Sequence, residues 1–151
     1  MNVLYRDLDG IEAVFLDLDG TLYLGDQLIE GALDFLARLE GSGIRRFFLS
    51  NNSSRSVDQY VEKLRGMGVP ASAEDVLLST HDLLSWLDSN GVSETYLVGT
   101  AGMQHMLEDA GVSTDSADPQ YVVLGYDTEI TYETVSYTHL RAHETDSYLV
   151  C

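Results

Sequence analysis

AVFLDLDGTLYLGD, residues 13–26, is the stretch that decides the fold of this chain. Its apolar residues run up to Asp17, as a β-strand buried on both faces of a sheet requires. Asp19 lies two positions further on, and residues two apart on a strand point to the same side. We therefore predict two carboxylates at the carboxyl end of a parallel strand, next to the crevice in which α/β folds bind their ligands.

The residues around the two carboxylates favour phosphoryl chemistry. One carboxylate can attack phosphorus while the other transfers a proton. Gly20 lets the backbone turn away, and the amides exposed in such a turn can hold a phosphate. The alternative is a turn whose acids only cap the next helix, but the strand, the spacing and Gly20-Thr21 together favour a catalytic pair. Asp7-Leu8-Asp9-Gly10 repeats the letters without an apolar strand before it, and we interpret it as a polar turn.

Short apolar runs alternate with longer amphipathic stretches along the rest of the chain. The runs predict strands over Glu12–Leu18, Arg45–Ser50, Val76–Ser79, Thr95–Val98 and Tyr121–Leu124. The amphipathic stretches predict helices over Ile29–Glu40, Ser56–Met67, Thr80–Asn90 and Gly102–Ala110, with capping glycines at Gly41, Gly68, Gly91 and Gly111. This alternation is typical of an α/β fold with a Rossmann-like parallel sheet covered on both faces.

A second polar segment, FFLSNNSSRS at residues 47–56, follows the second predicted strand. Its strand ends at Ser50, and Asn51 follows before the next helix, for which Ser56 and Gln59 form a capping box. A hydroxyl, an amide and a helix N-terminus can together accept a phosphate. Taken alone the signal is weak, because Ser and Asn clusters are common in caps and turns. Gly99–Gly102 also follows a strand and opens a helix, and there we favour plain loop geometry over an anion site.

Charge and composition exclude several classes of function. The chain carries 25 acidic and 8 basic residues, a formal net charge of −17, which would repel nucleic acid. The sequence contains no run of 18 apolar residues, the length that a membrane span requires, and the N-terminus does not resemble a signal peptide. Cys151 is the only cysteine. We expect a cytoplasmic protein, and the acidity leaves open whether its source is salt-loving.

Residues Asp17–Thr21 resemble motif I of the haloacid dehalogenase superfamily, and Ser50-Asn51 resembles its motif II. The resemblance implies that Asp17 is the nucleophile that forms an aspartyl-phosphate. It implies that Asp19 is the general acid and base, and that Mg²⁺ is bound by Asp17 and by the backbone carbonyl of Asp19. Ser50 and Asn51 would bind the transferred phosphoryl group. An acid at position 19 is typical of the phosphatases of this superfamily.

Three stretches, DGTLYLGD, FFLSNNSSR and YVVLGYDTEITYE, are similar to class IIA, the para-nitrophenyl phosphatase and ribonucleotide or sugar monophosphatase branch. One helix and one strand fill the interval from Asp17 to Ser50, so a cap domain must follow motif II. The resemblance implies residues 1–79 as the N-terminal part of an incomplete catalytic core and residues 80–134 as the start of an α/β cap. A small phosphorylated metabolite would be the substrate. The sequence leaves the substrate's identity and the oligomeric state open.

Two motifs that the superfamily needs are not recognisable. These are a lysine that offsets charge around the nucleophile and an acidic pair that completes the magnesium site. Lys63 lies within a predicted helix, while Asp127 and Glu129 lie in the cap segment. We therefore expect this chain to be a fragment that is inactive by itself. Alternatives are a non-catalytic phosphate-binding or interaction domain and, less favoured because of Asp19, a receiver domain phosphorylated on Asp17.

The histidines and the C-terminal stretch are interpreted separately. His81 and His105 are isolated and favour surface or capping roles over metal binding. From residue 135 the helical and strand periodicity ends, and SYTHLRAHET resembles a translated sequencing-adapter remnant. We therefore take residues 135–151 as a tail outside the family and expect few contacts between it and the body. His139 and His143 are spaced like a helical zinc pair, but no amphipathic helix surrounds them.

Overall fold

The computed structural model describes residues 10–126 and the backbone of residues 148–150. The chain divides into two compact units, residues 1–49 and residues 50–151, and each is described by itself. The predictions on His139, His143, Asp127 and Glu129 lie outside the described residues.

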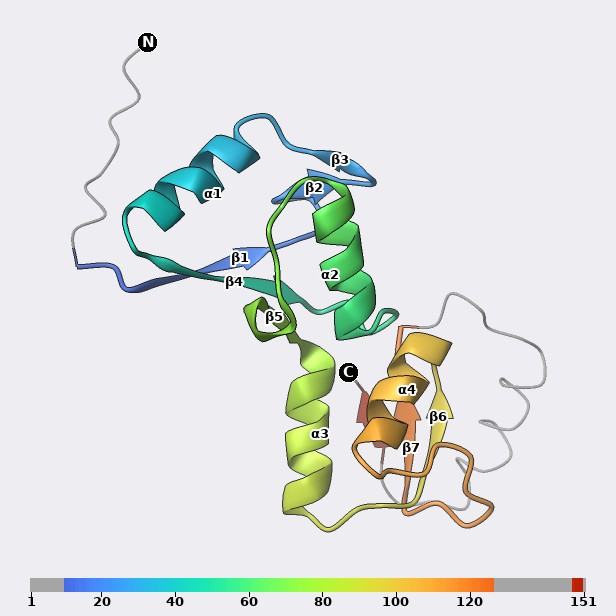
Figure 1. Ribbon diagram of the computed structural model, residues 1–151. Helices are drawn as coiled ribbons and strands as arrows, with labels where there is room; N and C mark the ends of the chain where they lie inside the picture. The colour runs from blue at the N-terminus through green and yellow to red at the C-terminus, as the bar shows by residue number, and fades with distance from the viewer. Residues whose placement is uncertain (1–9, 127–147, 151) are drawn as a thin grey trace. The chain divides into compact units, whose positions relative to one another are not determined.

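The first unit is built on two parallel strands (Figure 1). Its elements are β1 (Ala13–Asp17), β2 (Tyr23–Leu24), β3 (Gln27–Leu28), α1 (Ala32–Gly41) and β4 (Arg45–Ser50), the last of which ends on the first residue of the second unit. β1 pairs with β4 in parallel, with Ala13 opposite Arg45 and Asp17 opposite Leu49. The parallel pairing joined by a helix confirms the predicted α/β class.

The helix α1 differs at both ends from the predicted range. It starts at Ala32 because Gly31, its N-cap, has a left-handed backbone with φ of 85°. Its C-terminal glycine is Gly43, with φ of 69°, and Gly41 is still part of the helix. The cap at Gly41 is therefore a wrong prediction, since the left-handed residue lies two positions later. The antiparallel pair β2–β3 was not predicted, because strands of two residues leave no periodicity to detect.

The second unit contains the remaining elements. They are α2 (Val57–Gly66), the 3-10 helix η1 (Ala73–Asp75), β5 (Val76–Leu78), α3 (Ser79–Ser89), β6 (Thr95–Val98), α4 (Ala101–Asp109), β7 (Tyr121–Leu124) and β8 (Tyr148–Val150). The predicted bounds of β4, β6 and β7 agree with the structure, and α2, α3 and α4 agree to within a residue at each end. The cap glycines Gly68, Gly91 and Gly111 all have positive φ, as predicted.

A parallel sheet and two helices enclose the core of the second unit. β6 and β7 pair in parallel, with Thr95 opposite Tyr121, and β8 extends the sheet beyond β7. α3 and α4 contribute their apolar faces to a cluster made of Leu83, Leu87, Val92, Met103, Leu107, Val112 and Val123. Burial of this cluster is the main stabilising contribution to the unit.

The strand β8 corrects one expectation for the C-terminal stretch. Residues 148–150 pair in parallel with β7, so the expectation of few contacts is wrong for them. The sequence Tyr-Leu-Val has high β-propensity, and the free edge of β7 offers unpaired amides and carbonyls to it. Residues 135–147 and 151 lie outside the described residues, and the assignment of residues 135–151 to a separate tail stays a prediction.

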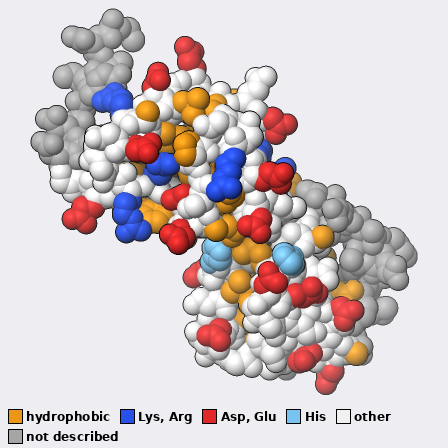
Figure 2. All heavy atoms as spheres, in the orientation of Figure 1, with side chains coloured by type: hydrophobic (Ala, Val, Ile, Leu, Met, Phe, Trp, Pro, Cys, Tyr) orange, Lys and Arg blue, Asp and Glu red, His pale blue; other side chains and the backbone are white. Residues whose placement is uncertain are grey.

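Among the described residues, every acidic side chain is exposed or partly exposed. Figure 2 shows acidic side chains spread over the visible face. In the described part of the chain, no helix is long and apolar enough to cross a membrane.

Candidate active site

The turn after β1 is held by its own backbone. The carbonyl of Leu18 accepts hydrogen bonds from the amides of Thr21, Leu22 and Tyr23, at 3.3, 2.9 and 3.3 Å. Gly20 has φ of 86° and donates its amide to Tyr23 at 2.8 Å. A side chain at position 20 would strain this left-handed conformation, which explains the glycine.

Burial alternates through this turn. The Leu18 side chain is fully buried, whereas Asp17 and Asp19 on either side of it are exposed. The structure thus brings the two predicted catalytic carboxylates into one exposed turn, and the buried Leu18 side chain between them belongs to the core. A buried apolar residue between two solvent-facing acids is the pattern that the strand alternation predicted.

One oxygen of the Asp17 carboxylate is occupied by a hydrogen bond. The hydroxyl of Thr21 donates to Asp17 Oδ2 at 2.8 Å, and both residues are exposed. This bond limits the rotation of the carboxylate and leaves its other oxygen, Oδ1, for a nucleophilic role. Thr21 therefore contacts the predicted nucleophile directly, beyond its value as part of a sequence motif.

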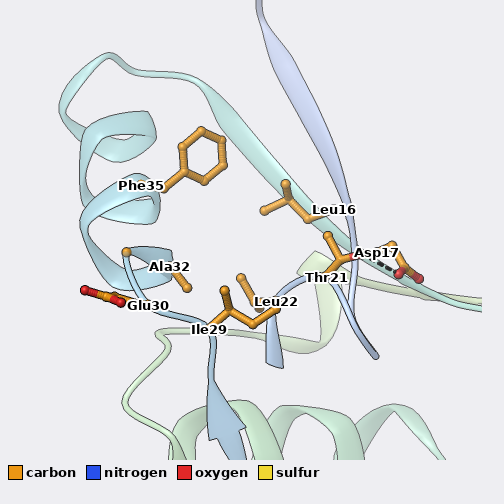
Figure 3. A pocket seen from close by; sticks show the side chains of 9 residues that line it. Leu16, Asp17, Thr21, Leu22, Ile29, Glu30, Ala32 and Phe35 are labelled. Carbon is orange, nitrogen blue, oxygen red and sulfur yellow. Dashed lines mark hydrogen bonds between the residues drawn. The ribbon is translucent and has the colours of Figure 1, made fainter. Parts of the chain in front are cut away.

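A recess of about 270 Å³ lies beside this turn in the first unit. Apolar side chains make most of its wall, and Asp17 and Glu30 are its acidic members; the full lining is Leu16, Asp17, Thr21, Leu22, Ile29, Glu30, Gly31, Ala32 and Phe35. Figure 3 shows the Asp17 carboxylate turned away from Phe35 and Ile29. With no basic side chain in its lining, the recess does not suit a phosphate, which requires cations or hydrogen-bond donors.

The segment after β4 is held by side chains rather than by its own backbone. Ser50 is buried, and its Oγ lies 2.9 Å from the hydroxyl of Tyr60 on α2. The amide of Asn52 donates to Ser50 Oγ at 3.2 Å, and the Tyr60 hydroxyl donates to the carbonyl of Asn52 at 3.2 Å. Tyr60 therefore braces the predicted phosphate-binding hydroxyl and the backbone beside it.

Asn51 presents its side chain to solvent while its backbone is held. It is exposed, and its carbonyl accepts a hydrogen bond from the Ser79 hydroxyl at 3.4 Å. In the same loop, the amide of Ser54 donates to Asn52 Oδ1 at 3.0 Å. The exposed Asn51 side chain is thus available to a ligand, as the prediction requires.

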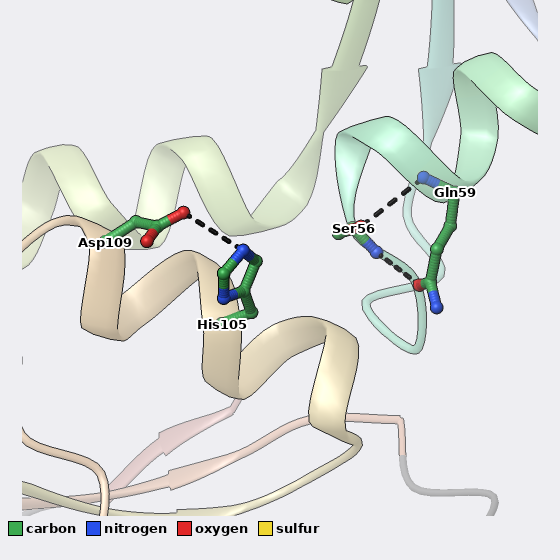
Figure 4. A network of polar contacts seen from close by, with 4 residues as sticks. All are labelled: Ser56, Gln59, His105 and Asp109. Carbon is green, nitrogen blue, oxygen red and sulfur yellow. Dashed lines mark hydrogen bonds and ion pairs between the residues drawn. The ribbon is translucent and has the colours of Figure 1, made fainter.

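Helix α2 begins directly after this loop. Ser56 is its N-cap: its amide donates to Gln59 Oε1 at 2.8 Å, and its Oγ accepts from the Gln59 amide at 3.4 Å. The predicted capping box is therefore confirmed (Figure 4). The remaining free amides of the first turn give this end of α2 a partial positive charge.

Sequence reasoning missed Tyr60. It lies ten residues after Ser50, on the buried side of α2. A tyrosine in such a position needs a partner for its hydroxyl, which was the one available signal. The sequence could not identify Ser50 as that partner, because the contact depends on the position of α2 relative to the end of β4 in the folded chain.

The two isolated histidines take the roles expected for them. His81 accepts a hydrogen bond from the amide of Leu78 at 3.1 Å, a capping contact at the start of α3. His105 lies 3.4 Å from Asp109 on the exposed side of α4 (Figure 4). Across the described residues, no group of three or more His, Cys, Asp or Glu side chains could hold a metal ion.

The donor set nevertheless fits part of a magnesium site. Mg²⁺ prefers oxygen ligands, retains several waters, and is commonly held by one or two carboxylates together with substrate phosphate oxygens. The Asp17 carboxylate and the Asp19 backbone carbonyl, both on exposed residues, are oxygen ligands of that kind. Further protein ligands would have to come from outside the residues described here.

The structure keeps the predicted site residues in two local groups. Asp17 and Asp19 share the turn after β1 in the first unit, and Ser50 and Asn51 share the loop after β4 in the second. Within the first unit, Asp17 is the register partner of Leu49, the residue before Ser50. Both groups therefore follow the carboxyl ends of strands that pair in parallel.

Comparisons with known proteins agree with this geometry. The sequence profile of haloacid dehalogenase-like hydrolases matches residues 14–113. The acid sugar phosphatase of Staphylococcus aureus (strain USA300) is 36% identical over 126 residues, covering 81% of this chain and 48% of that protein. A crystal structure of a 4-nitrophenylphosphatase from Thermotoga maritima matches with a TM-score of 0.88 and 35% identity, covering 97% of this chain and 56% of that one.

A further solved structure is informative about cofactors. It is a glycerol phosphate phosphatase from Mycobacterium tuberculosis in complex with magnesium. Its TM-score is 0.82 at 25% identity, covering 93% of this chain and 43% of that one.

The chain therefore belongs to the haloacid dehalogenase-like hydrolases. Within them it falls among the class IIA phosphatases, as the resemblance of its motifs predicted. It spans about half the length, 48%, of the Staphylococcus aureus relative.

Proposed function

We propose that this chain is the N-terminal part of a magnesium-dependent phosphomonoester hydrolase that acts through an aspartyl-phosphate. The observation that carries the proposal is Asp17 itself. It ends a parallel strand, is exposed, and has one carboxylate oxygen held by Thr21 while the other stays available for attack.

The proposed reaction has two steps. Asp17 Oδ1 attacks the substrate phosphorus, the bond from phosphorus to the leaving oxygen breaks, and Asp19 donates a proton to that oxygen. A water then attacks the phosphorus of the aspartyl-phosphate and gives a proton to Asp19. This second step releases inorganic phosphate and restores the Asp17 carboxylate.

The loop after β4 would bind the group in transfer. The Asn51 side chain can donate its amide hydrogens to phosphoryl oxygens. Because the Tyr60 hydroxyl donates its one hydrogen to the Asn52 carbonyl, the Ser50 hydroxyl donates to Tyr60 in this structure. Ser50 would redirect this hydrogen to a phosphoryl oxygen on binding, while still accepting from the Asn52 amide. Mg²⁺, when bound by Asp17 and Asp19, supplies positive charge that offsets the negative charge of the phosphoryl group.

The proposed substrate is a small phosphorylated metabolite. The relatives are named for sugar phosphates, 4-nitrophenyl phosphate and glycerol phosphate, all small monoesters. A net charge of −17 argues against a nucleic-acid substrate. We place the reaction in the cytoplasm.

We propose further that residues 1–79 are core, that residues 80–134 begin the cap, and that the isolated chain is inactive. The oxygen ligands of Asp17 and Asp19 alone are too few for a tight Mg²⁺ site. The 48% coverage of a relative's length supports the view that catalysis needs residues beyond these.

The test compares two proteins on an aryl phosphate, with Mg²⁺ or with chelator. One is the 151-residue chain, and the other is the full-length protein from the uninterrupted gene. We expect magnesium-dependent turnover from the full-length protein and none from the chain. Turnover by the purified chain, surviving a check for contaminating phosphatase, would contradict its proposed inactivity.

A non-catalytic phosphate-binding domain is the second candidate. The observation in its favour is that the Ser50 and Asn51 loop is well braced while no complete metal site exists among the described residues. A full-length protein that binds inorganic phosphate in calorimetry but never turns over aryl phosphates would favour this candidate.

A further inference from the structure

The loop of residues 51–55, called the Asn51 loop below, forms hydrogen bonds with residues far along the chain. The hydroxyl of Thr100 donates to the carbonyl of Ser54 at 2.7 Å across 46 residues of sequence. Thr100 is buried, at the N-cap of α4. This bond ties the backbone of the Asn51 loop to the residues between β6 and α4.

A second tie reaches the neighbouring residue of the loop. Ser53 is buried, and its Oγ accepts a hydrogen bond from the amide of Tyr126 at 2.8 Å across 73 residues of sequence. Tyr126 follows β7, so this contact comes from a different element than Thr100. Adjacent loop residues are thus held at two separate points of the α/β unit that contains β6, α4 and β7.

The backbone of the first turn of α4 closely approaches the residues that start α2. A Cβ added at Gly102 would lie 2.9 Å from the amide nitrogen of Ser56 and 2.7 Å from Gln59 Oε1. Both partners belong to the capping box that starts α2 (Figure 4). Because any side chain at position 102 would collide with backbone, the first turn of α4 is fitted directly against the start of α2.

We propose that Ser53 and Thr100 are positioning residues for phosphoryl binding. They hold the Asn51 loop in one conformation by fastening it to the β6–α4–β7 part of the chain. Ser50 and Asn51 would then meet the phosphoryl group without a cost for ordering the loop at binding. This inference rests on the proposed function, which assigns the phosphoryl group to Ser50 and Asn51.

The same hydrogen bond gives the Gly99–Gly102 segment a contact with the loop after β4. The Thr100 hydroxyl donates its hydrogen to the Ser54 carbonyl, so this hydroxyl has no hydrogen left for a ligand.

The test uses two threonines that differ in what they hold. Thr100→Val removes the hydroxyl that binds the Asn51 loop. Thr95→Val is the matched control, because Thr95 is also buried and donates its hydroxyl to a backbone carbonyl, that of Ser113, at 2.6 Å. Thr100→Ser keeps the hydroxyl and should rescue the loop.

Amide hydrogen exchange in the 151-residue chain reports on the loop without any turnover. In Thr100→Val we expect the amides of Asn52 and Ser54 to exchange roughly fivefold faster, the effect of losing one hydrogen bond of ordinary net strength. Ser53→Ala should act in the same direction. Thr95→Val and Thr100→Ser should leave these two amides near their original rates.

The functional arm uses the full-length protein and an aryl phosphate. Thr100→Val should raise KM roughly fivefold with little change in kcat, because the loop binds the phosphoryl group in ground state and transition state alike. Equal acceleration of the loop amides in Thr100→Val and Thr95→Val would overturn the proposal, as would failure of Thr100→Ser to rescue. If the loop amides respond as expected but the full-length protein shows no turnover, the proposed function is contradicted while the positioning of the loop by Thr100 is supported.

Discussion

The turn after β1 and the loop after β4 both place polar residues at the end of a parallel strand, but they are stabilised in different ways. The β1 turn relies on three amides that converge on the Leu18 carbonyl and on the left-handed Gly20. The Asn51 loop relies on side chains from α2, α3 and the start of α4. The first is a local structure, and the second exists only in the folded unit.

This difference explains why the two segments differ in sequence specificity. A turn made by its own backbone needs particular residues at particular positions, so Asp17 through Thr21 form a recognisable motif. In a loop held by distant partners, particular residue types are needed at those partners, such as Tyr60 and Thr100, and not in the loop itself. Its own sequence then resembles any cluster of caps and turns.

The largest effect should come from the nucleophile in the β1 turn. In the full-length protein, we expect Asp17→Asn to abolish turnover of an aryl phosphate with Mg²⁺, because an amide cannot form the aspartyl-phosphate. Asp19→Asn should slow turnover by roughly 10²–10⁴, the usual contribution of one acid or base group. Near-full activity of Asp17→Asn would contradict the assignment of the nucleophile to this turn.

The next effect concerns the backbone of the same turn. Gly20→Ala should lower the free energy of unfolding by about 1–2 kcal/mol, because an L-residue is strained at positive φ. No atom lies within 4 Å of the added Cβ, so the cost would be conformational and not steric. Chemical denaturation followed by circular dichroism measures it.

Gly41→Ala provides the matched control for Gly20→Ala. Gly41 also has open space around its added Cβ but lies in α1 without a positive φ. Alanine there should stabilise the chain by about 0.4–1 kcal/mol through the unfolded state. Equal effects of the two substitutions would show that the turn does not depend on its left-handed glycine.

The smallest effect should come from the brace of the Asn51 loop. Tyr60→Phe removes the hydroxyl that contacts Ser50 and Asn52, and we expect about 1 kcal/mol lower stability, the net contribution of a typical hydrogen bond. KM in the full-length protein should rise with it. Tyr121→Phe, whose ring packs edge-on against Trp86, is the control and should change KM little. A KM that responds equally to both would indicate a general loss of packing.

Much of the fold could be predicted because its signals are local. Strands β4, β6 and β7, the capping box at Ser56 and the glycine after α2 each follow from residues close together in sequence. The pair β2–β3 was missed because two-residue strands carry no periodicity. β8 was missed because its pairing with β7 depends on an edge that only folding creates.

The candidate site divides in the same way. The exposed carboxylates of Asp17 and Asp19 could be predicted from strand alternation and the glycine turn. The hydrogen bond from Thr21, the brace by Tyr60 and the tie from Thr100 could not, since each depends on side-chain directions in three dimensions. The roles of Asp17, Asp19, Ser50 and Asn51 in catalysis stay predictions.

The strand β1 carries an aromatic side chain two residues before its predicted nucleophile, on the same face of the strand. Phe15 is 59% exposed and stacks on Phe47 of β4 with ring centroids 5.2 Å apart. With this face open, water reaches Asp17, and charge interactions there have the effective dielectric constant of about 20 that is typical of a protein surface, higher than that of a dry interior. Any surface that covered Phe15 would also displace water from beside Asp17. The permittivity around the nucleophile, and with it the strength of every charge interaction there, thus depends on what shields this aromatic pair.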